Sequence, residues 1–333
     1  MKHPRHARSP FFAGFIVCMA LLAAAPASAQ EEPLPYLRGA PLTHANLTIL
    51  PLYAKDRAQP SGEFLTFEQA SKKKIVRVTE LNGSTSDAEV NAVHITNKGD
   101  KPVFILAGEV ILGGKQDRVI AKDTVVPPNA RKLEVAVFCV EQGRWDGRQA
   151  QFSASGKLGH SDLREKAVFA SDQGQVWDEV SKTNKKLKVA PSSGTYKASL
   201  KKAEADSALY VKAVLPRLQA DDRAVGVVVA IDGQVVSLDA FANPALFAQV
   251  RDKLVMAYAL EAANADGAGK EANVSADQVD GFFDEVRKAQ KGKREVKSGD
   301  ADNYFFDSDA VQGNESKGAR NKSIHKFYKA KKR

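Results

Sequence analysis

Polar side chains suited to ligand binding or acid–base chemistry follow two apolar, strand-like runs between Val103 and Trp145. These side chains are Glu109, Gln116, Arg118, Glu141, Arg144 and Trp145. If the two runs pair as neighbouring strands, their acids, amides and arginines converge at one end of a sheet. We therefore expect these six residues to form a polar ligand-binding site.

The two arginines, Arg118 and Arg144, indicate what such a site would bind. A guanidinium is a planar fork of donors that matches a carboxylate or a phosphate, which predicts an anionic small molecule or a protein partner. The alternative is that both arginines form ion pairs within the protein, with Glu109, Asp117 or Glu141 as partners. The two interpretations are compatible, because the acids can hold the arginines in place for a ligand.

Gly113-Gly114-Lys115 resembles a phosphate-binding loop but lacks its spacing. Gln116 stands where such a loop needs Ser or Thr to bind magnesium, so a turn that requires positive φ explains the glycines better. Trp145, in the second polar cluster, is either a platform on which a ligand stacks or a lid packed over the sheet end.

No complete catalytic signature accompanies these residues. Glu109 and Glu141 can act as general acid and base only if burial separates their pKa values. Cys139 shares strand parity with apolar Val135 and Val137, which predicts a buried, inert thiol. The sequence has no serine elbow and no metal-ligand spacing of His, Cys or acids. We expect no metal and no cofactor, and favour a protein without catalytic residues.

Residues 1–29 have the order of a cleaved secretory signal peptide. Three basic residues precede the uncharged run Phe11–Ala25, and Ala27-Ser28-Ala29 is a small-x-small cleavage pattern. The apolar run is short for a membrane span; the alternative is a retained anchor. We therefore expect a periplasmic or extracellular protein, with no transmembrane span after cleavage. Residues 30–45 are Pro-rich and should lie extended.

The net charge of +9 is unevenly distributed. Residues 287–333 hold 14 Lys and Arg against 6 Asp and Glu, whereas residues 30–286 are nearly neutral. This composition predicts a disordered, basic tail over 287–333. The alternative is an electrostatic tether to an anionic envelope surface. No fold signature for nucleic-acid recognition accompanies the charge, so sequence-specific binding to nucleic acid is not expected.

Residues 46–286 are expected to form one α+β domain, β-rich over 46–150 and mainly helical over 151–286. Short strand-like runs at regular spacing predict an antiparallel sandwich or barrel-like unit. These runs are Thr48–Tyr53, Ile75–Leu81, Glu89–Thr96, Val103–Leu112, Val119–Val126 and Lys132–Glu141.

The helical part contains three local signals. Asp232-Gly233 suits the primed turn of a β-hairpin over 224–238. Asn243 and Pro244 should cap and begin a helix that ends near Ala263. Ser275-Ala-Asp-Gln278 is a capping box that opens a short last helix.

The segments AGEVILGGKQDRVI and FCVEQGRW, separated by Pro127-Pro128, resemble a bacterial family, the ARG and Rhodanese-Phosphatase-superfamily-associated Protein domain. The resemblance covers roughly Leu47–Ala263, and GGKQDR and CVEQGRW are its most specific parts. The family name records genomic association and not an activity. The resemblance implies a shared fold and a shared polar site at Glu109, Gln116, Arg118, Glu141, Arg144 and Trp145, without a catalytic role.

The polar cluster without a complete catalytic set favours a non-enzymatic binding or interaction protein of the cell envelope or exterior. The alternative is a hydrolase that acts on a phosphorylated, nucleotide-like or other anionic substrate, with Glu109 or Glu141 as acid or base.

Overall fold

The computed structural model describes residues 36–55, 63–81, 91–145, 151–170 and 172–332. The expected signal peptide at 1–29 lies outside these described residues. By their contacts, residues Pro33–Arg333 group into a single unit. Within the described ranges, no helix is long and apolar enough to cross a membrane.

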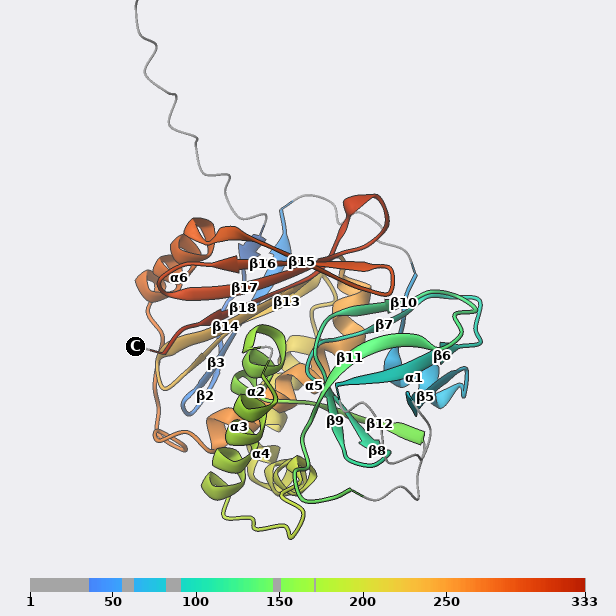
Figure 1. Cartoon of the computed structure of the whole chain (residues 1–333). Coiled ribbons are helices and arrows are strands. Elements are labelled where there is room, and N and C mark those ends of the chain that lie inside the picture. Colours follow the sequence, from blue (N-terminus) through green and yellow to red (C-terminus); the bar gives the residue numbers. More distant parts are fainter. Residues whose placement is uncertain (1–35, 56–62, 82–90, 146–150, 171, 333) are drawn as a thin grey trace, which may run out of the picture. The chain divides into compact units, whose positions relative to one another are not determined.

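Six antiparallel strands close into a barrel in the order β11-β6-β5-β12-β8-β9 (Figure 1). Their bounds are β5 Val76–Glu80, β6 Ala92–Asn97, β8 Glu109–Gly113, β9 Arg118–Ile120, β11 Leu133–Cys139 and β12 Gln151–Leu158. Apolar residues at alternate positions, such as Val78, Ile95 and Val137, fill its core, as the period of two in strands requires. The predicted α+β class with a barrel-like N-terminal unit is confirmed.

Two runs predicted as single strands each break in the middle. Val103–Leu112 becomes β7, Val103–Ile105, and β8; Val119–Val126 becomes β9 and β10, Thr124–Val126. In each run, one half belongs to the barrel and the other half does not. Strands β8 and β9 are barrel strands, whereas β7 and β10 pair with each other in a separate three-stranded sheet with the two-residue β4, Leu65–Thr66.

The break after β7 is built around a glycine with a left-handed backbone, Gly108, at φ 93°. A Cβ there would lie 2.4 Å from Arg164 Cγ, so a side chain is excluded by space as well as by conformation. The Asp123 carboxylate occupies the matching break after β9 and accepts a hydrogen bond from Ala107 N at 2.9 Å.

The large sheet combines the two ends of the described chain, in the order β1-β3-β13-β14-β18-β17-β16-β15, with β2 also paired to β3. The strands are β1 Tyr36–Arg38, β2 Leu42–His44, β3 Leu47–Ala54, β13 Ala224–Ile231, β14 Gln234–Phe241, β15 Gln290–Ser298, β16 Ala301–Asp307, β17 Val311–Lys317 and β18 Ser323–Ala330. The described part of 30–45 contributes the short strands β1 and β2, both paired with β3 at one edge of this sheet.

The prediction of a disordered tail over 287–333 is wrong. That segment supplies β15 to β18, and β18 lies inside the sheet between β14 and β17. Ile324, Phe327 and Tyr328 are buried there. Composition misleads because several lysines of this segment are paired: Lys326 and Lys317 with Glu315, and Lys329, Lys331 and Lys332 with aspartates. Pairing removes the self-repulsion that would keep such a segment unfolded.

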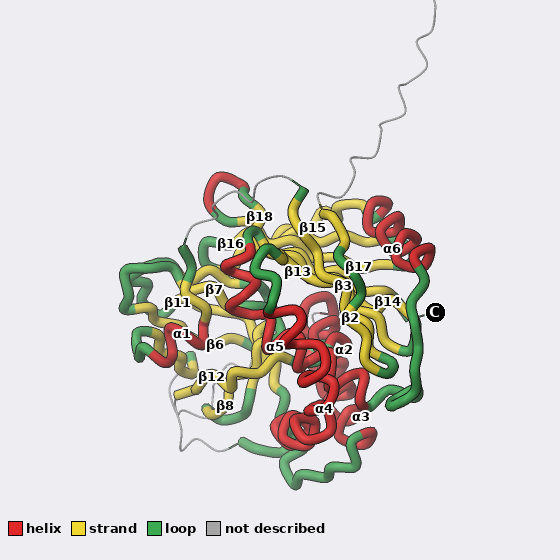
Figure 2. The backbone as a smooth tube through the Cα atoms, turned by 180° about the vertical axis from the view of Figure 1, so that it is seen from behind, coloured by secondary structure: helices red, strands yellow, loops and turns green. Residues whose placement is uncertain are grey.

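Helices cover both faces of the large sheet. The α-helices of the described chain are α1 Phe67–Lys72, α2 Ser161–Glu165, α3 Gln173–Lys186, α4 Tyr196–Gln219, α5 Pro244–Ala263 and α6 Ala276–Lys288. Of these, α4, α5 and α6 contact the large sheet, whereas α1 and α3 contact strands of the barrel. From behind, α4 and α5 lie side by side (Figure 2), and both pack on the face formed by Ile49 and Val229. The opposite face, with Leu50 and Val228, receives α6.

The local signals of the C-terminal half are confirmed. Asp232 and Gly233 adopt positive φ of 53° and 73° between β13 and β14. Asn243 caps α5 by accepting a hydrogen bond from Leu246 N at 2.8 Å. The Ser275 capping box opens α6, with both reciprocal hydrogen bonds present.

Candidate functional site

Two loops meet at one end of the barrel, and one hydrogen-bonded residue fixes them together. The β8–β9 turn spans Gly114–Asp117, and the other loop follows β11 from Val140 to Trp145. Asp117 accepts from Gly113 N at 2.9 Å through its carboxylate, and its carbonyl accepts from Val140 N at 2.9 Å. Gly114 has φ 54°, and a Cβ would lie 2.2 Å from Phe152 Cζ. Gly113 ends β8 and Gly114 begins the turn, and both have the positive φ that the sequence predicts for the pair.

Arg144 is the clamp between these loops. Its Nε donates to Glu141 Oε2 at 2.8 Å, and its Nη1 donates to Gly114 O at 2.8 Å. Its Nη2 donates to Gly113 O and to Asp117 Oδ1, both at 3.2 Å. Most of the guanidinium's donors are thus committed to the protein, which matches the ion-pair interpretation of this arginine.

Glu141 is equally committed. Its Oε1 accepts from Ser193 Oγ at 2.7 Å, and its Oε2 accepts from Asp117 N at 3.1 Å as well as from Arg144. Burial opposes ionisation, but the hydrogen bonds from Arg144, Ser193 and the Asp117 amide together lower the pKa of Glu141. This carboxylate stays ionised at neutral pH, so it does not have the proton that a general acid must supply.

The neighbouring carboxyl shifts in the opposite direction. Burial raises the pKa of Asp117, and the charge of Glu141 adds to the rise, while Gly113 N, Thr195 and Arg144 oppose it. Its Oδ2 accepts from Thr195 Oγ1 at 3.1 Å, at the start of α4. The acids therefore join the barrel end to α4 and the loop before it.

Gln116 and Arg118 continue this network inward. Gln116 Nε2 donates to Glu141 O at 2.8 Å, and Arg118 Nη1 donates to Gln116 O at 2.8 Å. The Arg118 side chain is fully buried, with Nη2 3.8 Å from Glu80 Oε1 and its guanidinium 5.9 Å from the centre of the Phe152 ring. It lies within the barrel, where a ligand in solvent does not reach it.

Inside the barrel, the ion pair of Arg118 and Glu80 is incompletely hydrogen-bonded. Among the described residues, Glu80 Oε2 and the Nε and Nη2 atoms of Arg118 have no hydrogen-bond partner. Cys139 faces the same interior, and burial raises the pKa of its thiol to about 11. The prediction of a buried thiol is confirmed, and protonation makes it a poor nucleophile at neutral pH.

Trp145 is the member of the predicted set that faces solvent most, with 49 % of its surface exposed. Lys115 Nζ lies 4.8 Å from the centre of its ring, which is cation–π geometry. Lys115 N donates to Glu80 Oε1 at 2.8 Å, so the lysine backbone is fixed to the barrel wall. A large exposed indole is therefore held over a positioned ammonium group.

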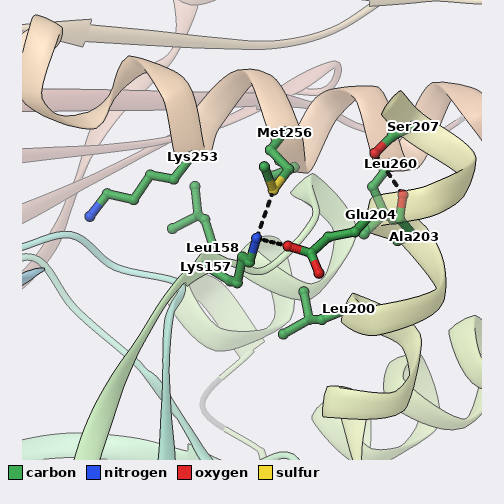
Figure 3. A pocket seen from close by; sticks show the side chains of 10 residues that line it. Lys157, Leu158, Leu200, Ala203, Glu204, Ser207, Lys253, Met256 and Leu260 are labelled. Atoms are coloured by element: carbon green, nitrogen blue, oxygen red, sulfur yellow. Dashed lines mark hydrogen bonds and ion pairs between the residues drawn. The ribbon is translucent and has the colours of Figure 1, made fainter. Parts of the chain in front are cut away.

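Glu109 has a different set of partners. Its Oε1 lies 2.6 Å from Lys253 Nζ on α5 and accepts from Leu106 N at 3.3 Å. Lys253 lines a pocket of about 10 Å³ between β12, α4 and α5, room for about one water. Figure 3 shows the Lys253 amine directed away from Lys157, which contacts Glu204 and Met256. The hydrogen bonds that link Gln116, Arg118, Glu141 and Arg144 do not include Glu109.

A second polar network, which the sequence analysis missed, lies between the barrel and the large sheet. His325 Nδ1 is 2.7 Å from Asp123 Oδ2, and its Nε2 is 3.0 Å from Asp239 Oδ1. Arg164 binds both oxygens of Asp239, at 2.7 and 3.1 Å, and Tyr258 donates to the same carboxylate. These five side chains, all nearly or fully buried, are called the central network below.

The central network charges its histidine. Burial alone would lower the pKa of His325, but the carboxylates of Asp123 and Asp239 raise it above its usual range. Arg164 and His325 in turn hold the pKa of Asp239 far below its usual range, against the effect of burial. The sequence holds one signal of this network: Asp123 and Asp239 each lie within a mostly apolar run. A carboxylate at a core position is buried only when it has a partner, so each of these acids predicts a buried partner.

Comparison with curated proteins and with solved structures gives no match. The model of one protein family matches residues 36–328, which include most of the basic segment as well as the barrel. This range covers nearly all of the described chain, so it extends the resemblance carried by GGKQDR and CVEQGRW to strands of the large sheet at both ends of the chain. The chain belongs to the ARG and Rhodanese-Phosphatase-superfamily-associated Protein domain family.

Proposed function

We propose that this protein is a non-enzymatic binding protein of the periplasm or cell exterior, which recognises a protein partner through Trp145 at the end of the barrel. The observation that carries the proposal is the exposed indole beside Lys115, on two loops that Arg144 hydrogen-bonds together. Tryptophan anchors supply much of the binding energy at protein interfaces. The location rests on the order of basic, apolar and small residues within 1–29.

The charges around Trp145 support a protein partner over a small anion. Three cations, Lys115, Arg118 and Arg144, stand with three carboxyl groups, Glu80, Asp117 and Glu141. A small anion would meet no net positive charge here, and would have to displace hydrogen bonds that Arg144 already makes. An apolar or aromatic group of a partner needs neither change, because it packs on the indole.

The same hydrogen bonds argue against the hydrolase alternative. The Glu141 carboxylate accepts three hydrogen bonds, and the Glu109 carboxylate is paired with Lys253. A general acid or base must be free to exchange a proton with a substrate within hydrogen-bond reach. Neither glutamate lines the small pocket near α5 or the larger pocket described below.

The test compares two substitutions of exposed apolar residues. Trp145→Ala removes the proposed anchor, and Leu209→Ala on α4, 70 % exposed, is the matched control. Partner capture from secreted and periplasmic fractions should fall about 30-fold for Trp145→Ala, as expected when an anchor worth about 2 kcal/mol is lost. A photo-crosslinking residue at 145, but not at 209, should give one discrete adduct.

Two outcomes would contradict the proposal. One is a folded Trp145→Ala protein that keeps its full affinity for every captured partner. The other is turnover of a phosphorylated, nucleotide-like or other anionic substrate by the purified protein, abolished by Glu141→Gln or Glu109→Gln.

A further inference from the structure

A second pocket lies on a different part of the fold, where the three-stranded sheet meets the loops of the C-terminal strands. A pocket of about 260 Å³ opens there. Its walls come from both regions: Phe64, Pro102, Val125 and Pro128 on one side, and Asp300, Gly318, Ala319, Lys322 and Ile324 on the other. Figure 1 shows the β15–β16 end of the large sheet beside β10.

The pocket is held open by backbone bonding across this seam. Val125 and Gly299 form a parallel bridge, and Asp300 N donates to Val125 O at 2.8 Å. Gly299 has φ 59°, and a Cβ there would lie 1.9 Å from Val125 O, so the close approach requires glycine. Thr124 Oγ1 and Ser298 Oγ are 2.6 Å apart beside it. A site held in this way is formed before any ligand arrives.

The floor of the pocket is apolar and packed against the protein core. Val125 and Ile324 belong to the main hydrophobic core, and the partly buried Phe64 packs on Phe104 with ring centres 6.1 Å apart. An apolar cavity of about 150 Å³ is enough to bind benzene. The volume here therefore suits one aromatic ring that carries a short chain.

The rim adds two charges of opposite sign. Asp300 and Lys322 are both exposed, and within the described ranges neither side chain has an ion-pair or hydrogen-bond partner. Placed at one mouth, a carboxylate and an ammonium complement a ligand that carries one charge of each sign.

We propose that this pocket binds a small aromatic zwitterion, of the class of aromatic α-amino acids. The ring enters the apolar pocket, the ligand's ammonium pairs with Asp300, and its carboxylate pairs with Lys322. The site is independent of Trp145 and adds a small-molecule function to the proposed partner binding.

The test is calorimetric titration of the purified protein with L-phenylalanine. Phenethylamine lacks the carboxylate, hydrocinnamate lacks the ammonium, and toluene lacks both. We expect L-phenylalanine to bind most tightly, the two singly charged compounds to bind about two- to fivefold more weakly, and toluene weakest, since exposed ion pairs contribute at that level. Glycine, which has no ring, should not bind.

Variants locate the binding. Ala319→Phe should fill the pocket and abolish binding with the unfolding midpoint unchanged, because Ala319 is exposed. Asp300→Asn should remove the preference for L-phenylalanine over hydrocinnamate, which lacks the ammonium. Lys322→Gln should remove the preference for L-phenylalanine over phenethylamine, which lacks the carboxylate. Asp309→Asn and Lys297→Gln, at exposed positions that do not line the pocket, are matched controls and should bind as the unaltered protein does.

Three results would overturn the proposal. The first is no heat of binding with L-phenylalanine up to its solubility limit. The second is toluene binding as tightly as L-phenylalanine, which would make the pocket merely apolar. The third is undiminished affinity in a folded Ala319→Phe protein, which would place the binding elsewhere.

Discussion

His325 couples its protonation to the stability of the fold, because its pKa is raised in the folded protein. Asp123 and Asp239 contact its two ring nitrogens, while Arg164 from α2 and Tyr258 from α5 close the other side of Asp239. Breaking a buried pair of this kind by removing one partner destabilises a protein by about 3–5 kcal/mol, because a buried charge is left uncompensated.

This arrangement predicts a particular dependence of stability on pH. The pKa of His325 is raised from 6.5 on folding, so its stabilising contribution is complete below pH 6.5 and is lost as pH rises through the folded-state pKa. Asp123 and Asp239 have lowered pKa values, so their contribution is present above an ordinary Asp pKa and is lost in strong acid.

Urea unfolding across pH measures this directly. The free energy of unfolding should decline above pH 6.5 in the unaltered protein, and the slope should flatten in His325→Gln. A His325→Gln protein with the same alkaline slope as the parent would show that another group is responsible.

Among the elements, β13 shows how closely the large sheet is packed. A Cβ on Gly226 would lie 2.2 Å from Asp239 O and 2.7 Å from Ala240 Cα, and both of these atoms belong to the backbone of β14. Backbone atoms inside a sheet cannot move aside as a flexible side-chain end can. Gly281, on the exposed side of α6, has no neighbour within 4 Å of such a Cβ.

The two glycines should respond to alanine with opposite signs. Gly226→Ala should lower the free energy of unfolding by about 1–3 kcal/mol through overpacking. Gly281→Ala should raise it by about 0.5–1 kcal/mol through helix propensity. Denaturant titration of both variants measures these changes in the free energy of unfolding. Equal changes would show that the close approach of β13 and β14 does not exclude a side chain at position 226.

Elements whose signals are local could be predicted from the sequence, and those set by distant partners could not. Asn243 and Pro244 fix the start of α5 by themselves. By contrast, apolar continuity predicts one strand over Val103–Leu112, because nothing nearby shows that Asp123 and Gly108 turn the chain into a second sheet.

The same division applies to the candidate sites. The convergence of Gln116, Glu141 and Arg144 follows from pairing of strands near in sequence. The partners of Glu109 and Arg118, Lys253 and Glu80, lie on other elements. The central network joins Asp123 to His325 across 202 positions, and no spacing rule spans that distance.

At the scale of the whole molecule, the basic C-terminal segment completes the fold. Without β17 and β18, β14 would lose one of its two neighbouring strands, and Asp123 and Asp239 would lose the imidazole between them. A chain that ends at Asp309 should therefore show no cooperative unfolding transition in circular dichroism or calorimetry.

A chain that starts at Gln30 is the matched control for this truncation, since residues 1–29 fall outside the unit Pro33–Arg333. It should unfold at the same midpoint as the parent. Cooperative unfolding of the chain ending at Asp309 would return the segment to the status of a separable extension, as an envelope tether requires.

The position of β18 in the sequence also determines when the large sheet can be completed during synthesis. Strands β3, β13 and β14 are synthesised well before Ser323–Ala330 is added, yet β14 has no partner strand on its second side until then. Pairing over such separations is slow, so a growing chain keeps one edge of β14 unpaired until Ser323–Ala330 is added. During that interval a chaperone or a translocation channel would meet a chain with an unpaired strand edge. The late position of β18 in the sequence prolongs the interval.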